Sequence, residues 1–359
     1  MLISAVVVNL DARELLLSCV ASIEAALARI DGPTEILVVD NGSTDGAPSA
    51  LRAAHPRVRV VELGENLGFA AAANAGVEAT TGDWLLLLNN DATLDPAAVV
   101  ELARAATGQP EVGALAVQMR FAADGRINSA GFGVDRLGVA YDRHLGRAPR
   151  ESERDPTPVF GASAGAALMR RTMLDELAGF DPSFFLYLED VDLAWRARMR
   201  GWECLYVPAA VAHHRHSATS RHGSPFKHFH VGRNRVRLLA KNMPTRELLI
   251  WWPGIVAYDL AYCAFAGLTD RTLMPVRGRI VGLREWRVYR RAGAARRSVE
   301  LAPVEGPWRA LRRRRGARVG GGAARRPGGR GDGSGRDSGG GRDGGGGRGG
   351  RDAGDPRSG

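Results

Sequence analysis

The chain has 359 residues, of which 45% are apolar, and a formal net charge of +10. This length accommodates two domains or one large α/β domain with appendages, and the apolar share excludes a wholly disordered chain. The 14 Arg and 5 Asp from Arg309 onward carry nearly all of the net charge, so the rest of the chain is close to neutral.

Cysteine usage and the N-terminus indicate an intracellular protein. Cys19, Cys204 and Cys263 are far apart and form no C-x-x-C pair, so a disulfide framework is not expected and a reducing cytoplasm fits best. Residues 1–8 are apolar but have no basic region before them, which favours a first strand over a signal peptide.

In chain order, the first half alternates strand and helix patterns. The expected strands cover residues 3–8, 35–39, 58–63 and 84–88, and the expected helices follow Asp11 and cover residues 69–79 and 97–106. Asp11 is expected to cap its helix, with Glu14 three residues later completing a capping box. This order predicts an α/β fold, a mostly parallel sheet with helices on both faces.

The second half is less regular. Residues 120–158 are rich in Gly, Arg, Asp and Pro and are expected to form a long, partly mobile connection. Strands are expected at residues 166–170 and 203–207, and a helix at residues 190–200, ended by Gly201.

The C-terminal part begins with an apolar stretch at residues 248–268, interrupted by Pro253 and Asp259. Its length is compatible with a membrane span, but the central Asp and Pro argue against a simple one. A helical pair is expected instead, packed on the body or lying in a membrane interface. Its aromatic residues would then sit at headgroup depth and its flanking Arg residues on anionic lipid. These aromatic residues are Trp251, Trp252, Tyr258 and Tyr262.

Acidic and amide side chains follow two of the buried strands. Residues 84–88 end in Asn89-Asn90-Asp91, and residues 35–39 end in Asp40. In an open parallel sheet ligands bind just beyond the carboxyl ends of the strands. Oxygen-rich side chains at that edge are suited to hold a hard cation against a diphosphate, so the pattern suggests a nucleotide-diphosphate site. The alternative is a plain Asn/Asp turn after a buried strand.

Together the motifs resemble those of family 2 glycosyltransferases of the GT-A fold, close to the bacterial rhamnosyltransferase group. The matching segments, in family order over roughly residues 1–245, are residues 8–9, 38–45, 66–70 with 74–76, 88–91, 185–192 and 207–208 through His214 and Ser217. The resemblance implies a Rossmann-like GT-A domain with a C-terminal helical extension. No motif identifies the acceptor.

The resemblance also implies roles for single residues. Asp190 would be the general base that deprotonates the acceptor hydroxyl, with Glu189 and Asp192 as supporting carboxylates. Asp91 and His214 would hold Mg²⁺ or Mn²⁺, with His213 as the alternative to His214. The nucleotide would be contacted by Asn9, Asp40, Asn66, Gly68, Asn90 and Asp91. Acidic first turns of helices are common without any function, and Arg196 is expected to pair with Asp192.

The basic segment 221–237 contains Lys227, Arg233, Arg235 and Arg237. A cationic loop there could close on the diphosphate of donor or acceptor. The alternative is a solvated basic helix face.

The expected organisation has four parts. Residues 1–115 would form the nucleotide-sugar-binding half, residues 116–245 the acceptor-binding half, and residues 246–302 a helical, membrane-associated segment. The Arg/Gly-rich tail 303–359 has a composition that cannot bury a core and is expected to be disordered.

The resemblance favours dTDP-rhamnose as donor, with UDP-sugars as the alternative. The acceptor would be a cell-wall glycan or a polyprenyl-diphosphate-linked glycan. The enzyme would work in the cytoplasm, peripherally on anionic lipid at the inner face of the cell membrane.

Other features of the sequence suggest different functions. Gly161-Ala162-Ser163-Ala164-Gly165 matches a nucleophile elbow, so Ser163, Asp190 and His214 could form a serine esterase triad. The Arg/Gly tail could bind nucleic acid, but almost no aromatic residues accompany it. A sugar nucleotidyltransferase would need a Gly-rich loop after the first strand, and a zinc site with Cys204 lacks ligand spacing.

Overall fold

The computed structural model describes residues 1–150, 152–215, 223–293 and 296–304. The strands are β1 (Ile3–Asn9), β2 (Thr34–Asp40), β3 (Arg59–Glu62), β4 (Trp84–Asn89), β5 (Ala92–Leu94), β6 (Val112–Phe121), β7 (Ile127–Ser129), β8 (Phe132–Val134), β9 (Ala140–Asp142), β10 (Thr157–Val159), β11 (Ala166–Arg170) and β12 (Glu203–His214). The helices are α1 (Arg13–Leu27), α2 (Ala47–Ala54), α3 (Phe69–Glu78), α4 (Ala98–Ala106), α5 (Arg171–Leu177), the 3₁₀ turn η1 (Pro182–Phe184), α6 (Glu189–Met199), α7 (Pro225–Asn242), α8 (Thr245–Thr269), α9 (Met274–Arg284) and α10 (Trp286–Ala292).

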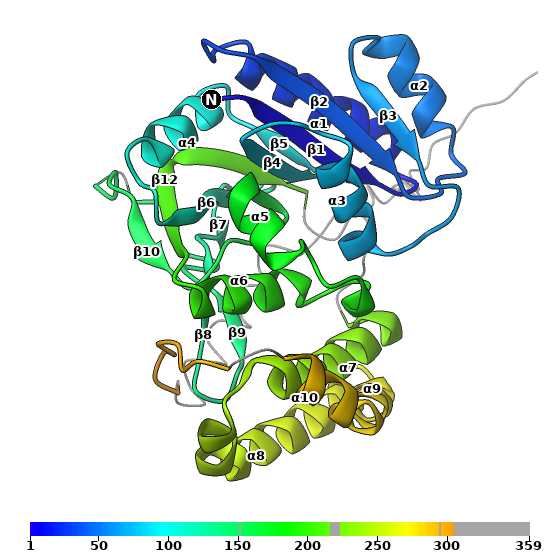
Figure 1. Cartoon of the computed structure of the whole chain (residues 1–359). Helices are drawn as coiled ribbons and strands as arrows, with labels where there is room; N and C mark the ends of the chain where they lie inside the picture. Colours follow the sequence, from blue (N-terminus) through cyan, green and yellow to red (C-terminus); the bar gives the residue numbers. More distant parts are fainter. Residues whose placement is uncertain (151, 216–222, 294–295, 305–359) are drawn as a thin grey trace, which may run out of the picture. The chain divides into compact units, whose positions relative to one another are not determined.

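One large mixed sheet organises these elements (Figure 1). Its strand order is β10-β12-β6-β11-β4-β1-β2-β3, with β5 paired to β12 and β7 paired to β6. The pairs β1–β2, β1–β4, β2–β3 and β6–β12 are parallel, whereas β11 runs antiparallel between β4 and β6. The expected α/β class, with a mostly parallel Rossmann-like sheet, is confirmed.

Strand β4 shows why the sheet is buried on both faces. Leu86 and Leu88 pack into the core formed with α1 and α4, while Leu85 and Leu87 pack into the core formed with α3 and α5. Successive residues of a strand point to opposite faces, so four consecutive leucines supply both layers.

Two local predictions were wrong. The segment 120–158 contains the short strands β7, β8 and β9 and the start of β10, and β10 pairs with β12, far away in sequence. Asp11 does not cap α1: its carboxylate accepts a hydrogen bond from the Thr44 backbone N–H at 2.7 Å, and the helix begins after Ala12 without a side-chain cap. The Asp11 carboxylate is therefore occupied by the loop that follows β2.

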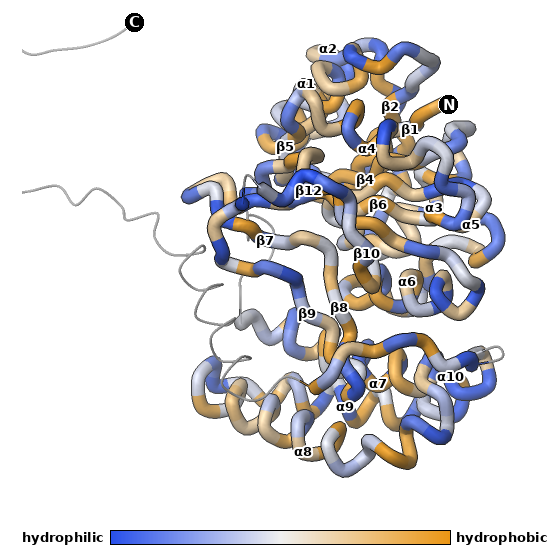
Figure 2. Tube along the Cα trace, turned by 90° about the vertical axis from the view of Figure 1, so that its left-hand side faces the viewer, coloured by the Kyte–Doolittle hydropathy of each residue, from blue (hydrophilic) through white to orange (hydrophobic). Residues whose placement is uncertain are grey.

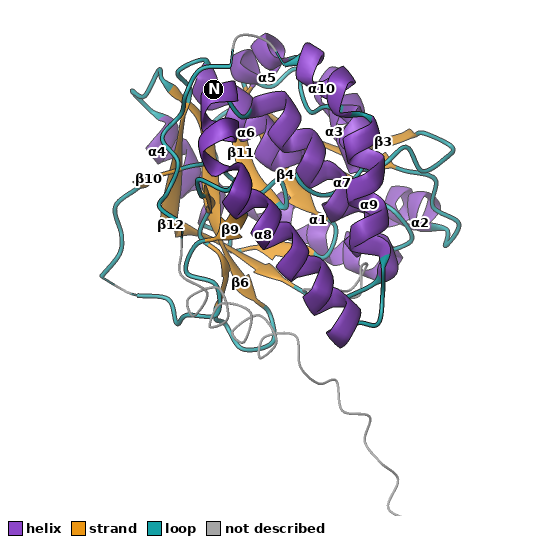
Figure 3. Ribbon diagram, turned by 90° about the horizontal axis from the view of Figure 1, so that it is seen from below, coloured by secondary structure: helices purple, strands orange, loops and turns teal. Residues whose placement is uncertain are grey.

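The C-terminal segment is a layer of helices. The apolar stretch forms one 25-residue helix, α8, which continues through Pro253, so the expectation of a helical pair was wrong. Helix α9 packs closely on α7: a Cβ on Gly278 would lie 2.2 Å from the Phe229 carbonyl oxygen, so only glycine fits there. Figure 3 shows α7, α8 and α9 side by side. The expected disordered tail falls outside the described residues, apart from residues 303–304.

Candidate active site

A cleft of about 760 Å³ lies beyond the carboxyl ends of β1 and β4. Strand ends, the entry to α6 and the start of α7 all line it. Its polar lining includes Asn41, Asn66, Asn90, Asp91, Asn128, Asp142, Ser163, Glu189, Asp190, His214 and Lys227. The structure therefore brings together residues from both halves of the chain.

Asp91 and His214 meet at one side of this cleft. His214 is the last residue of β12 and pairs in register with Ala92, which follows Asp91 directly. The His214 Nε2 atom lies 3.0 Å from Asp91 Oδ1, and its Nδ1 atom lies 3.0 Å from the side-chain oxygen of Asn128. A neutral imidazole held through its other ring nitrogen is the usual arrangement of a metal-binding histidine.

These two side chains fit a divalent cation. Asp91 Oδ1 is buried, and apart from the His214 ring nitrogen it has no close polar partner in the described part of the chain. Within the described ranges, no group of three or more His, Cys, Asp or Glu is placed to hold a metal. A cation here would need further oxygen ligands from a diphosphate, as is usual for Mg²⁺. His213 points elsewhere, with its Nε2 atom 2.9 Å from Asp95, so it is not an alternative ligand.

Asn9 and Asp40 lie beneath the cleft rather than on its wall. Asn9 is fully buried and accepts a hydrogen bond from the Asn90 amide at 2.9 Å. Its own amide donates to Asp40 at 3.3 Å, and the other Asp40 oxygen accepts from the Ser43 backbone N–H at 3.0 Å. Asn90 is thus oriented by a chain of hydrogen bonds that ends at Asp40.

Asn66 and Gly68 shape the loop before α3. The Asn66 side-chain oxygen accepts hydrogen bonds from the Asn41 amide and from the Gly68 backbone N–H, both at 3.0 Å. Gly68 has φ +83°, and a Cβ there would lie 2.5 Å from the Phe185 ring. Glycine is required here because the loop crosses the segment that leads into α6.

The segment that leads into α6 is strained. Phe185, Tyr187 and Leu188 all have φ between 65° and 70°, a region that side-chain-bearing residues rarely adopt. Such conformations persist where surrounding contacts fix them, and they concentrate at functional sites. They direct the first turn of α6 into the cleft.

Asp190 is the carboxylate at the centre of this turn. Its oxygens accept hydrogen bonds from the backbone N–H groups of Val191 at 2.8 Å and Ala164 at 3.3 Å. Burial raises the pKa of Asp190 to about 6, and the negative charge of Asp142 adds to the effect. Burial, together with the charge of Asp190, also raises the pKa of Glu189. Asp190 can therefore accept a proton near neutral pH.

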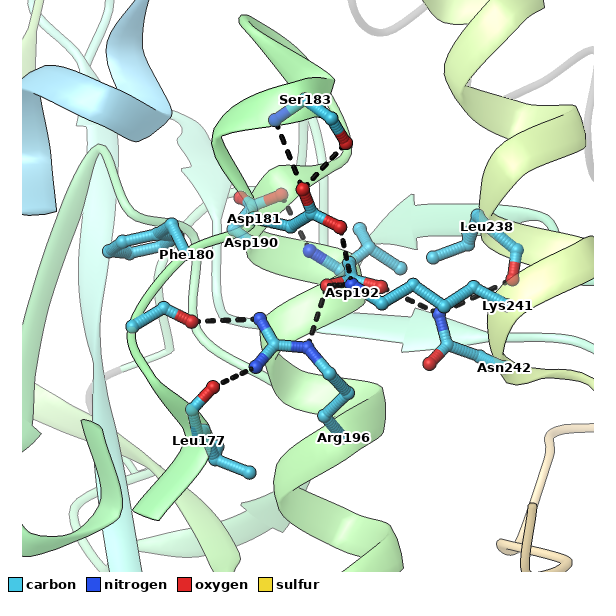
Figure 4. A network of polar contacts seen from close by, with 12 residues as sticks. Leu177, Phe180, Asp181, Ser183, Asp190, Asp192, Arg196, Leu238, Lys241 and Asn242 are labelled. Carbon is cyan, nitrogen blue, oxygen red and sulfur yellow. Dashed lines mark hydrogen bonds and ion pairs between the residues drawn. The ribbon is translucent and has the colours of Figure 1, made fainter. Parts of the chain in front are cut away.

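Asp192 lies two residues further along α6 and is not among the residues that line the cleft; it belongs to a network of polar contacts (Figure 4). It is fully buried. Lys241 lies 2.9 Å from it and Arg196 2.7 Å, and the Asn242 amide donates to it at 2.8 Å. Lys241 also pairs with Asp181 at 2.6 Å. The predicted Arg196–Asp192 pair is confirmed, as part of a network that joins α6 to α7.

Sequence reasoning missed two polar residues of the cleft. Asn128 and Asp142 both come from the segment expected to be a mobile connection, and β7 and β9 place them beside His214 and Asp190. No local pattern marks these strands, because each is three residues long.

The described basic residues of segment 221–237 fall into two groups, one that lines the cleft and one that does not. Lys227 lines the cleft, 5.3 Å from the Tyr187 ring, and burial lowers its pKa. The arginines instead hold the helices together: Arg235 pairs with Asp259 and Arg237 with Glu285, while Arg233 donates to the Phe184 carbonyl. Among the described basic residues of this segment, only Lys227 contributes to the wall of the cleft.

The esterase triad is not assembled. Ser163 lines the same cleft, but its hydroxyl accepts from the Gly165 backbone N–H in a loop before β11, not at a strand-to-helix turn. The two ring nitrogens of His214 face Asp91 and Asn128, and the carboxylate of Asp190 accepts from backbone N–H groups. No base is therefore directed at a serine nucleophile by these contacts.

Comparisons with known proteins agree with this geometry. Residues 4–178 match the family model of Glycosyl transferase family 2. An N-acetylglucosaminyl-diphospho-decaprenol L-rhamnosyltransferase from Mycobacterium tuberculosis is 33% identical over 225 residues, which covers 56% of this chain and 72% of that protein. An N-acetylglucosaminyltransferase from Azorhizobium caulinodans is 38% identical over 211 residues, covering 55% of this chain and 50% of that protein.

Among solved structures, GalNAc-T7 with UDP, GalNAc and Mn²⁺ superposes with a TM-score of 0.54 at 16% identity. The match covers 69% of this chain and 49% of that one. At this identity the likeness concerns the fold alone.

Proposed function

This chain belongs to glycosyl transferase family 2 and is a nucleotide-sugar glycosyltransferase, and from this premise we propose that it transfers rhamnose from dTDP-rhamnose to a polyprenyl-diphosphate-linked glycan, with inversion. The sugar and the acceptor are suggested by the name of the Mycobacterium tuberculosis relative. The observation that carries the reaction type is the presence of Asp190 in the same cleft as the Asp91–His214 pair.

Asp190 is proposed as the general base. A single displacement with inversion needs one group to take the proton of the acceptor hydroxyl as the new glycosidic bond forms. Asp190 has no ion pair among the described residues, and its pKa of about 6 leaves it ionised at neutral pH. Glu189, with its pKa raised by burial and by Asp190, would hold a proton beside it and leave the second carboxylate as the base.

Asp91 and His214 are proposed to hold Mg²⁺ or Mn²⁺ together with the diphosphate of the donor. When bound, the cation would offset the negative charge that develops on the departing dTDP. The surroundings of Asp91 support this, because its Oδ1 atom is buried with the His214 ring nitrogen as its close polar partner among the described residues, and a bound cation would neutralise the buried carboxylate.

The nucleotide is proposed to lie between the loop of Asn66 and Gly68 and the end of β4. Asn90 would contact it directly, and Asn9 and Asp40 would fix Asn90 from beneath. Acceptor selection would fall to residues 116–245, which supply Asp142 and Lys227. Because the acceptor is a lipid, the enzyme would work at the inner face of the cell membrane.

Calorimetric titration with dTDP, UDP and GDP, each with and without Mn²⁺, tests the donor site. We expect Mn²⁺-dependent binding that is tightest for dTDP, followed by transfer from dTDP-rhamnose to a polyprenyl-diphosphate-linked N-acetylglucosamine. Preference for UDP would keep the glycosyltransferase assignment and replace the donor. Failure of every nucleotide to bind would contradict the proposed site.

A further inference from the structure

The C-terminal helices carry most of the exposed apolar side chains of the described chain. On α8, α9, α10 and the turn between α8 and α9 these are Leu249, Ile250, Trp252, Val256, Leu260, Leu268, Leu273, Val276, Ile280, Leu283 and Val288. Leu249 is 70% exposed and Leu260 66%. A groove of about 640 Å³ along α8 and α9 is lined mostly by apolar side chains, with Thr245, Asp259, Arg279 and Arg290 as its polar residues. Figure 2 shows hydrophobic residues recurring along α8. Exposed apolar surface on this scale marks an interaction site.

The charges of the same helices are separated. Each of the four acidic residues binds a protein partner: Glu247 binds Ser298, Asp259 binds Arg235 and Arg279, Asp270 binds His228, and Glu285 binds Arg237. Six arginines are exposed and form no ion pair within the described ranges, namely Arg246, Arg271, Arg277, Arg284, Arg287 and Arg291. The apolar surface is therefore accompanied by uncompensated positive charge, which complements anionic lipid headgroups.

Helix α8 is long and apolar enough to cross a membrane, but its contacts oppose this orientation. Asp259, in its middle, lies 2.6 Å from Arg235 on α7 and 2.8 Å from Arg279 on α9. Crossing the bilayer would take these ion pairs into the hydrocarbon or break them, and would separate α8 from its neighbours. A helix held sideways on the protein can instead lie in the plane of the interface.

The aromatic residues distinguish the two sides of α8. Trp252 is 58% exposed, as expected for an interfacial residue. Tyr258 and Tyr262 instead face Arg235 and Arg279, with the guanidinium groups 4.8 Å and 5.0 Å from the ring centres. Trp251 stacks under Arg136 in the same way, at 5.6 Å. Of the four aromatic residues expected at headgroup depth, only Trp252 is exposed, whereas the other three face arginines of the protein.

We propose that α8, α9 and α10 together form a docking face for an anionic phospholipid bilayer, with α8 lying along the surface rather than spanning it. Helix α9 packs on α7, and the N-terminal residues of α7 line the cleft. Docking through this face would hold the cleft at a fixed distance from the lipid. The inference rests on the proposed function only for the lipid nature of the acceptor. Binding to lipid vesicles can therefore be measured independently of sugar transfer.

Vesicle co-sedimentation of the full chain tests the proposal. Phosphatidylcholine vesicles are compared with phosphatidylcholine–phosphatidylglycerol vesicles, at low and high salt. We expect binding to the anionic vesicles that weakens at high salt. Leu249→Glu with Leu260→Glu should weaken this binding by about 10-fold or more, because two inserted side chains become charged. Arg284→Gln with Arg287→Gln should weaken it by about 10–30-fold at low salt only.

Two control variants carry the same types of charge change at exposed positions outside the docking face. Ala25→Glu with Ala53→Glu adds the same charge to exposed positions of α1 and α2, and Arg29→Gln with Arg57→Gln removes exposed arginines that have no ion pair in the described chain. Both should bind vesicles as the unmodified protein does. Equal losses in the controls would show a general effect of net charge and overturn the proposal.

Three further outcomes would also overturn it. Unchanged binding of both face variants would assign lipid attraction to other residues, such as the Arg-rich residues after 304. A dimer by light scattering that the Leu variants dissociate, with no loss of vesicle binding, would make the face an interface between two copies. Labelling of Arg246→Cys and Thr269→Cys from opposite sides of sealed vesicles would show that α8 spans the bilayer. Labelling of both from the outside supports the surface orientation.

Discussion

The cleft and the junction of α6 with α7 hold carboxylates from the same helical turn, in opposite surroundings. Asp190 faces the cleft, where backbone N–H groups bind it and no cation pairs with it in the described chain. Asp192, two residues on, is fully buried between Lys241, Arg196 and Asn242. Two carboxylates of one acidic motif, two residues apart, thus differ in what they can do. An uncompensated carboxylate can take a proton, whereas a compensated one fixes two helices together.

The strongest test of this contrast is Asp190→Asn. We expect the rate of transfer to fall by about 10²–10⁴-fold, because the amide cannot accept the acceptor proton. Donor binding should be unchanged, since Asp190 is proposed to act on the acceptor only. Steady-state kinetics and calorimetry measure the two quantities. Near-normal transfer by this variant would remove Asp190 from the mechanism.

The complementary variant is Asp192→Asn. We expect the free energy of unfolding to fall by about 3 kcal/mol, because Arg196 would lose its carboxylate partner and Lys241 would keep only Asp181. Urea denaturation measures this, with Asp190→Asn as the matched control at the same helix turn. A variant of full stability but low activity would place Asp192 in the reaction and abolish the contrast.

Asp91→Ala extends the comparison to the other side of the cleft. We expect Mn²⁺-dependent nucleotide binding to weaken by about 10–100-fold. Removal of a residue that only hydrogen-bonds to a metal ligand already lowers metal affinity by this amount. His213→Ala is the control, because its side chain contacts Asp95 outside the lining of the cleft. Titration of the nucleotide at fixed Mn²⁺ measures the effect, and equal affinity of both variants would argue against the proposed metal site.

The smallest expected effect is on the pH dependence of stability. The pKa of Asp190 is raised to about 6 from an ordinary value of 3.8, so the folded state favours its protonated form. The resulting destabilisation is absent below pH 3.8, grows as the pH rises, and is complete above pH 6. At neutral pH, Asp190→Asn should therefore be more stable than the unmodified protein, by on the order of 1 kcal/mol. Urea titrations at pH 4 and pH 7 measure the difference, and a variant less stable at pH 7 would contradict it.

The sequence predicted the first half of the fold well because its elements have strong local patterns. The four consecutive leucines of β4 and the apolar strand β2 could be assigned without knowing their neighbours. The strands β7 to β10 could not, because each is three residues long, and β10 in addition pairs with β12, far away in sequence. Local propensity is weak where long-range pairing decides the structure.

The residues of the candidate site also differ in whether a local sequence pattern predicts them. Asp91, His214 and Asp190 carry motifs, and the structure places all three in one cleft. Asn128 and Asp142 reach the cleft only through the short strands, so no spacing in the sequence marks them. The opposite orientations of Asp190 and Asp192 could not be deduced from an acidic helix start either, since they depend on Lys241, 49 residues after Asp192.

The position of β11 between β4 and β6 has a consequence for biosynthesis. Strands β4 and β6 leave the ribosome before β11 does. Until β11 is made, the nascent chain therefore has two unpaired strand edges that both pair with β11 in the folded protein. Elongation from residue 121 to residue 170 takes several seconds at ordinary rates of translation. During that interval β4 and β6 can pair wrongly with each other or with another chain. We expect a ribosome-bound fragment ending before residue 166 to depend on chaperones, and one that includes Arg170 and its linker to be protected from proteolysis.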